Sequence, residues 1–65
     1  MTLGNKIAEL RKEKGMTQEA LANALGVSNQ AVSKWEANQS CPDIQLLPQL
    51  ADFFGVKYRK DFLNL

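Results

Sequence analysis

Residues 18–37, QEALANALGVSNQAVSKWEA, constrain the fold more than any other part of the chain. They are predicted to form two short amphipathic helices joined at Gly26, where glycine permits a backbone conformation that residues with a Cβ disfavour. Ala22 is small enough to let the two helices approach each other. Val32 and Trp35 are spaced i, i+3, so they share one face of the second helix. This pattern predicts a helix-turn-helix, a motif whose second helix offers its exposed face to the DNA major groove.

Start and stop signals extend this pattern along the chain. The hydroxyl groups of Thr17 and Ser28 can cap the two helices of the motif, and Gly15 ends a helix before it. Pro48 has no N–H to donate within a helix, so it is expected in the first turn of a later helix, after a loose turn over residues 42–45. No run alternates with period two. We therefore predict an all-α chain, one domain over residues 1–65, with five helices: about 3–14, two within 18–37 (the second about 29–36), 46–54 and 57–63.

Length and composition exclude several functional classes. A chain of 65 residues leaves little room for a catalytic cleft beside a core. It has no histidine and one cysteine, so it lacks both the usual Cys/His metal site and an internal disulfide. Cys41 is expected to be a small, part-buried residue before Pro42. The pattern places no nucleophile–base pair or carboxylate pair, so we expect neither an enzyme nor a cofactor.

Charge and hydropathy describe the expected surroundings. Met1 is followed by no apolar run, and no stretch approaches membrane-spanning length, so a cytoplasmic protein without a membrane partner is expected. If the motif binds DNA, the protein is expected at the nucleoid. The net charge of +1 gives no general attraction to nucleic acid. No acidic residue lies between Glu19 and Glu36, however, so the predicted reading surface carries Lys34 and neutral amides and has nothing to repel phosphate.

A helical wheel identifies the exposed face of that helix. With Val32 at 0° and 100° per residue, Gln30 and Lys34 lie opposite the buried side, and Ser33 lies at the edge of the exposed face. Asn29 is lateral, but it stands at the helix start, which points into the groove. Side-chain amides can pair with adenine N6 and N7 together, and Lys34 can donate to guanine or to phosphate. The alternative is that such side chains simply face water, as on any surface helix.

Two further features concern the helix ends. Gln18 begins the first helix of the motif, where its backbone N–H and amide can hold a phosphate; the alternative is a solvated first-turn residue. Arg11 and Glu36 both fall at the edges of buried stripes. A partly buried Arg11–Glu36 ion pair is predicted to orient the second helix, without direct readout by Glu36.

The strings LRKEKGMTQEALANALGVSNQAVSKWEANQSCPD and LLPQLADFFGV resemble the lambda-repressor-like family of helix-turn-helix proteins, in register over nearly the whole chain. The resemblance implies five helices, DNA binding through the second and third, and a buried Arg11–Glu36 salt bridge. This sequence departs from the family at Trp35, which is larger than usual, and at Ala37-Asn38, where a glycine is common and Asn38 would take the positive φ. The expected base readers are Gln18, Asn29, Gln30, Ser33 and Lys34, and the expected phosphate contacts are Thr17, Gln18, Ser28, Asn38, Gln39 and Ser40.

The predicted function is sequence-specific binding of double-stranded DNA by a transcriptional regulator, with repression favoured and no small-molecule ligand evident. An antitoxin-type autoregulator and a protein-interaction module that retains only the fold are the alternatives. A weak homodimer on a two-fold operator is expected. Tyr58 and Leu65 are the candidates to contact the second copy, because the C-terminal stretch holds more large apolar side chains than one short helix can bury; the alternative is that both fold back on their own core.

Overall fold

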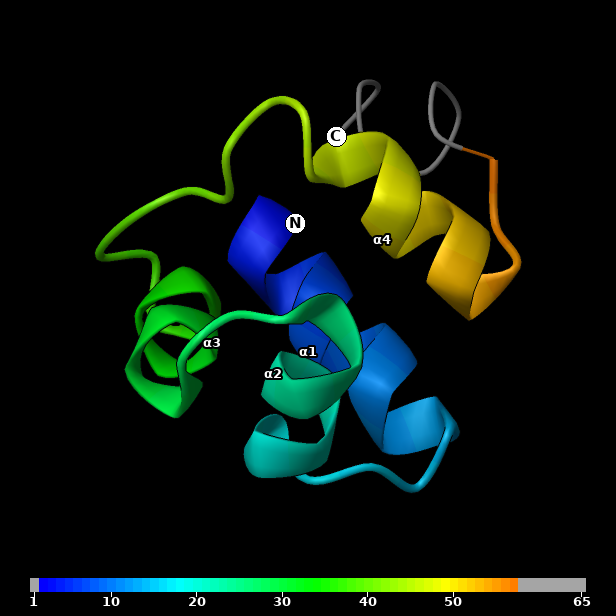
Figure 1. The fold of residues 1–65 in the computed structure, drawn as a ribbon, viewed down its shortest axis with the longest axis horizontal. Coiled ribbons are helices and arrows are strands. Elements are labelled where there is room, and N and C mark those ends of the chain that lie inside the picture. The colour runs from blue at the N-terminus through cyan, green and yellow to red at the C-terminus, as the bar shows by residue number, and fades with distance from the viewer. Residues whose placement is uncertain (1, 58–65) are drawn as a thin grey trace.

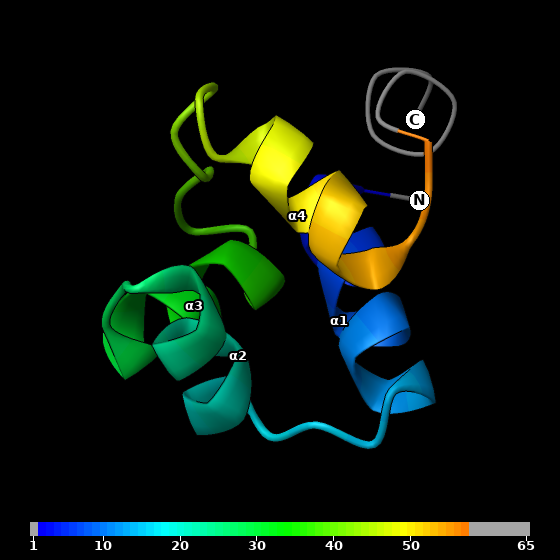
Figure 2. The ribbon, with the colours of Figure 1, turned by 45° about the vertical axis from the view of Figure 1, so that its right-hand side comes forward.

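A computed structural model describes residues 2–57, and all regular structure within that part of the chain is helical. α3 packs against both α2 and α1. The views of Figure 1 and Figure 2 agree in placing α4 beside α1. The four helices are α1 (Leu3–Glu13), α2 (Gln18–Leu25), α3 (Asn29–Glu36) and α4 (Leu47–Phe54).

Hydroxyl side chains cap the N-termini of the first three helices. Thr2 Oγ1 accepts a hydrogen bond from the backbone N–H of Asn5 at 3.1 Å, and the same device recurs at α2 and α3. Each cap satisfies a donor that the first turn of a helix leaves without a backbone partner. The helix starts predicted from Thr17 and Ser28 are therefore confirmed.

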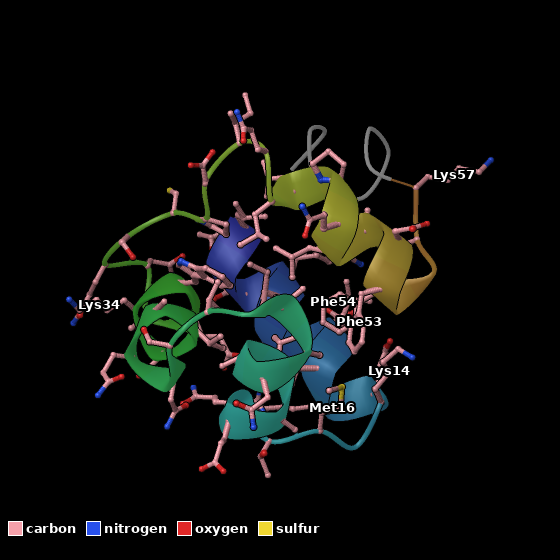
Figure 3. All side chains as sticks on the ribbon, viewed as in Figure 1. Lys14, Met16, Lys34, Phe53, Phe54 and Lys57 are labelled. Carbon is pink, nitrogen blue, oxygen red and sulfur yellow. The ribbon has the colours of Figure 1, made fainter. Side chains whose placement is uncertain are left out.

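One core joins the four helices. Ile7, Leu21, Val32 and Leu50, one residue from each helix, are completely buried. Burial of such side chains is the main stabilising term for a small domain. Lys14, the residue after α1, is exposed, and its ammonium lies 5.3 Å from the ring centre of Phe53 (Figure 3).

The predicted start of α4 is correct to within one residue. Asp43 Oδ1 accepts from the N–H of Gln45 at 3.0 Å, which forms the expected turn before the helix. α4 then begins at Leu47 with Pro48 in its first turn, where the missing N–H leaves no helical bond unmade.

One prediction is wrong, and another concerns residues that the structure does not describe. Cys41 is exposed rather than part-buried, because the neighbouring Pro42 takes the buried position. The fifth helix was expected over residues 57–63, and all of that range except Lys57 lies outside the described residues. Residues 2–57 contain four helices. Among residues 2–57, no helix combines the length and the apolar character needed to span a bilayer.

Candidate nucleic-acid interface

The turn between α2 and α3 is short and fixed by hydrogen bonds. Gly26 adopts φ 73° and ψ 30°, in the left-handed region that glycine occupies without a steric penalty. The N–H of Val27 donates to Ala22 O at 3.0 Å, which closes the end of α2. Ser28 follows at once and caps α3, its Oγ accepting from the N–H of Ala31 at 3.1 Å. Only two residues therefore separate the glycine from α3, which is held firmly against α2.

α3 has a buried face and an exposed polar face. Val32 is completely buried and Trp35 is 5% exposed, so these two side chains anchor the helix to the core. Figure 3 shows Lys34 pointing away from the body of the molecule. The exposure predicted from the helical wheel is confirmed for Asn29, Gln30, Ser33 and Lys34.

The start of α2 also lies at the surface. Thr17 Oγ1 accepts from the N–H of Ala20 at 3.0 Å, and Thr17 itself is exposed. The first N–H groups of a helix carry the positive end of its dipole, which favours a nearby anion. Gln18, the first residue of α2, is half-buried, and its amide has a partner within the protein.

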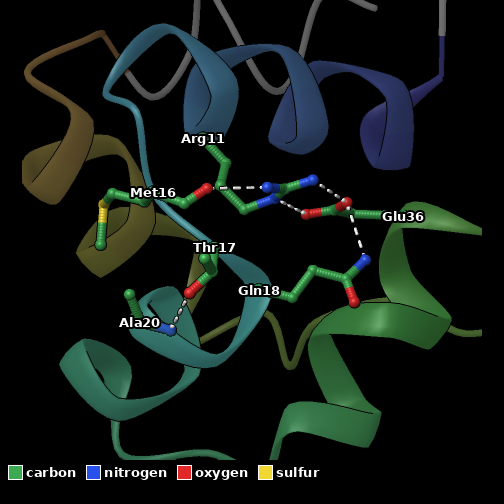
Figure 4. A network of polar contacts seen from close by, with 6 residues as sticks. All are labelled: Arg11, Met16, Thr17, Gln18, Ala20 and Glu36. Atoms are coloured by element: carbon green, nitrogen blue, oxygen red, sulfur yellow. Dashed lines mark hydrogen bonds and ion pairs between the residues drawn. The ribbon is translucent and has the colours of Figure 1, made fainter.

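That partner is Glu36, whose carboxylate connects three helices (Figure 4). Arg11 of α1 donates from Nε to Glu36 Oε2 at 2.7 Å and from Nη2 to Oε1 at 3.0 Å. Gln18 of α2 donates from Nε2 to the same Oε1 at 3.1 Å. Arg11 also donates from Nη1 to Met16 O at 2.7 Å, so the loop before α2 belongs to the same network.

The network keeps Glu36 ionised although it is nearly buried. The side chains of Arg11 and Glu36 are 13% and 8% exposed. Burial raises the pKa of the Glu36 carboxyl, but the hydrogen bonds from Arg11 and Gln18 and the nearby positive charges outweigh it, so the pKa lies below its usual range. The hydrogen bond to Glu36 raises the pKa of the Arg11 guanidinium. The negative charge at the end of α3 is therefore neutralised by Arg11 within the protein.

The loop after α3 turns at Asn38. Asn38 has a φ of 61° and is the one non-glycine residue with positive φ in the described part of the chain. The prediction that Asn38 takes the positive φ in place of the usual glycine is therefore confirmed. The N–H of Gln39 donates to Lys34 O at 2.9 Å, so the loop closes back on α3. Asn38, Gln39 and Ser40 are all exposed beside the end of that helix.

The predicted site residues thus fall into three groups. The first two are the exposed face of α3 and the start of α2, which lie on helices joined by the network, and the third is the loop at Asn38, which is joined to α3 by the bond from Gln39 N–H to Lys34 O. The ion pair Arg11–Glu36 is present, whereas its extension to Gln18 was not predicted, because no pattern in the sequence relates the first residue of α2 to the last residue of α3. Tyr58 and Leu65 lie outside the described residues. Within residues 2–57, no three His, Cys, Asp or Glu side chains gather where they could hold a metal ion.

Comparison with known proteins gives a consistent family match. The family profile described as helix-turn-helix matches residues 7–60, which include all of α2, α3 and α4. The chain is 41% identical over 56 residues to the HTH-type transcriptional activator BcrR of Enterococcus faecalis. This match covers 86% of the chain but 28% of BcrR.

Two other relatives differ in length and in stated role. An uncharacterised HTH-type transcriptional regulator of Methanocaldococcus jannaschii is 39% identical over 59 residues, with 91% of this chain and 89% of that protein covered. The cryptic phage CTXphi transcriptional repressor RstR of Vibrio cholerae is 35% identical over 52 residues, with 80% of this chain and 47% of the repressor covered. The chain thus spans less than half of BcrR and RstR and most of the archaeal regulator.

Proposed function

The chain belongs to the lambda-repressor-like helix-turn-helix family, and we propose that it is a transcriptional regulator that binds double-stranded DNA sequence-specifically. The observation that carries the proposal is the geometry of α3. Its buried face is anchored by Val32 and Trp35, its polar face is exposed, and the Gly26 turn holds it beside α2. A helix presented in this way enters the major groove, with its N-terminal residues against the base edges.

The polar residues of α3 are assigned to base readout. Gln30 and Asn29 can each pair an amide with adenine N6 and N7, and Lys34 can donate to guanine O6 and N7 or to phosphate. Ser33, also exposed, can contact either kind of group. Gln18 completes the set from the start of α2.

Phosphate contacts flank the reading helix on both sides. The caps of α2 and α3 place hydroxyls and backbone N–H groups near the surface, where they can meet phosphate oxygens. The loop after α3 provides a second polar surface. The residues assigned to phosphate are Thr17, Gln18, Ser28, Asn38, Gln39 and Ser40.

Charge at this face suits DNA although the net charge is only +1. Lys34 is exposed on α3, and the one acidic residue of that helix is paired with Arg11. Phosphates approaching α3 thus meet a cation and neutral amides. The small net charge leaves a weak general attraction, so affinity depends on these local contacts.

Repression from a two-fold operator is the proposed mode of action. RstR is named as a repressor and BcrR as an activator, so the relatives include both directions of control. One such domain reads few base pairs, and two copies on half-sites about 34–36 Å apart double the contacts. We assign a weak dimer contact to Tyr58 and Leu65, and the compartment of action is the bacterial or phage-infected cytoplasm.

Titration of the protein against duplex DNA at two salt concentrations tests the proposal. Selection from a random duplex library first supplies a preferred sequence. We expect that duplex to bind more tightly than a scrambled one, with affinity falling as salt rises because cationic contacts such as Lys34 displace cations from the phosphates. An interaction module that retains only the fold shows no duplex affinity at either salt concentration, and this result would refute the proposal.

A further inference from the structure

The hydrogen bond between Gln18 and Glu36 fixes which end of the Gln18 amide faces inward. Glu36 is an ionised carboxylate, which can only accept hydrogen bonds. The amide nitrogen of Gln18 lies 3.1 Å from Glu36 Oε1 and donates to it. The amide oxygen is turned the other way, as Figure 4 shows. The reversed amide would bring two acceptor oxygens together without a proton between them.

Arg11 prevents the carboxylate from adapting to a reversed amide. It holds both oxygens of Glu36, at 2.7 Å and 3.0 Å, and is itself tied to Met16 O at 2.7 Å. A carboxylate that accepts hydrogen bonds from Arg11 at both oxygens cannot rotate to release Gln18. The lowered pKa of Glu36 keeps it from acquiring a proton to donate near neutral pH. The amide of Gln18 is therefore oriented before any ligand arrives.

We propose that Glu36 is a positioning residue that makes Gln18 present an acceptor to DNA, so that Gln18 selects a base carrying an amino group in the major groove. This inference rests on the proposed function. The amino groups in question are adenine N6 and cytosine N4, and thymine O4 and guanine O6 are rejected because they are acceptors. The amide nitrogen carries a second N–H, which can still donate to a phosphate oxygen.

Orientation in advance gives Glu36 a role that differs from simple support of the fold. A glutamine free in solution populates both amide orientations and must be ordered on binding, which costs affinity. A fixed orientation removes that cost and, once the second N–H is engaged by a phosphate, leaves only the amide oxygen, an acceptor, to meet the base. A purely structural Glu36 would affect stability and overall affinity but would leave the base preference unchanged.

The orientation can be measured without DNA by nuclear magnetic resonance of the full chain labelled with 15N. The side-chain amide signals of Gln18 are assigned in the wild type from nuclear Overhauser contacts within the residue. We expect one amide proton of Gln18 to lie downfield of, and exchange more slowly than, those of Gln49, which is exposed on α4. Both differences should disappear in Glu36→Gln. Gln18 protons that match those of Gln49 in the wild type would overturn the proposal, and this comparison requires no folded variant.

The effect on DNA is measured as the relative affinity for the four base pairs at each operator position. Gln18→Ala identifies the position that Gln18 reads, with a loss of preference of about three- to tenfold for one hydrogen bond. Glu36→Gln should alter preference at that same position. In the Gln18→Ala background, Glu36→Gln should cause no further change in preference.

A matched control separates positioning from stability. Leu50→Val removes one carbon from a completely buried side chain of α4, which carries no member of the network, so it should lower stability and leave the base preference unchanged. Independent effects of Gln18→Ala and Glu36→Gln on preference, with a wild type that binds selectively, overturn this inference alone. A wild type with no duplex affinity overturns the proposed function and this base selection with it, while the resonance experiment still decides the amide orientation.

Discussion

Gly4 lies so close to the backbone carbonyl oxygen of Trp35 that a Cβ at this position would overlap it. The same Cβ would come within 2.6 Å of Asn38 Oδ1. Gly4 is buried in the first turn of α1, although its backbone conformation is ordinary. The missing side chain lets α1 approach the end of α3, the helix that carries the proposed base readers.

Gly4→Ala should therefore destabilise the domain. Alanine is the better helix former by about 1 kcal/mol, so the change would stabilise an unobstructed helix. The neighbouring atom is backbone and cannot move aside, and overpacking of this kind costs about 1–3 kcal/mol. The free energy of unfolding in urea measures the balance. Asn5→Ala, at an exposed position in the same turn, serves as the control and should change stability by less than about 0.5 kcal/mol. A gain in stability for Gly4→Ala would show that α1 does not pack this closely.

The features predicted correctly from the sequence are those that depend on neighbours along the chain. Capping by Thr17 and Ser28, the positive φ of Gly26 and the delayed start of the helix at Pro48 each follow from local backbone chemistry. Helical periodicity likewise placed Gln30 on the exposed face. These local signals agree with one another, as expected for a sequence that specifies a single fold.

The features missed depend on contacts between distant parts of the chain. The sequence gives no sign that Gly4 meets Trp35, or that Gln18 meets Glu36, because each contact follows from the angle between two helices. Cys41 was wrongly expected to be part-buried, since the sequence does not show which residue of a loop faces the core. The Arg11–Glu36 ion pair was predicted correctly because both residues lie at the edges of apolar stripes, and this position restricts where their side chains can meet.

Substitutions at Asn38 should rank by their tolerance of positive φ. Asn38 has φ 61°, a left-handed conformation that costs an ordinary L-residue about 1–2 kcal/mol of folding free energy. We expect Asn38→Ala to lower the free energy of unfolding by about that amount and Asn38→Gly to lower it less, because glycine has no Cβ to strain. Urea unfolding of the two variants measures the difference. Equal losses would show that the loop does not require a left-handed residue.

Arg11→Met should destabilise the domain by about 1–3 kcal/mol, because it leaves the buried Glu36 carboxylate without its charged donor. Met16 O loses a hydrogen bond in the same variant. The double change Arg11→Met with Glu36→Leu removes the unpaired charge and should recover part of the loss. Unfolding free energies of the two single variants and the double variant measure the coupling. Strictly additive values would indicate that the two side chains do not interact.

The stability of the domain should depend on pH through Glu36. Its pKa is lowered in the folded state, so folding is favoured by ionisation. This contribution is complete above the unfolded pKa of about 4.3 and is lost as pH falls through the lower, folded pKa. The Arg11→Met/Glu36→Leu variant lacks the group and should lose less stability over the same acid range. Urea unfolding at several pH values below about 5 tests this comparison; parallel curves for the two proteins would contradict it.

Gln30→Ala should weaken binding to the preferred duplex by about 1–3 kcal/mol and relax the preference at one base pair in each half-site. The reason is the position of Gln30, exposed on α3 on the side opposite Val32. Competition among duplexes that differ at single base pairs measures the preference. Gln49→Ala, which removes an equally exposed glutamine from α4, serves as the control and should leave the preference unchanged. If Gln30→Ala weakens binding to all duplexes equally, Gln30 contacts the DNA backbone and the base preference depends on other residues of α3.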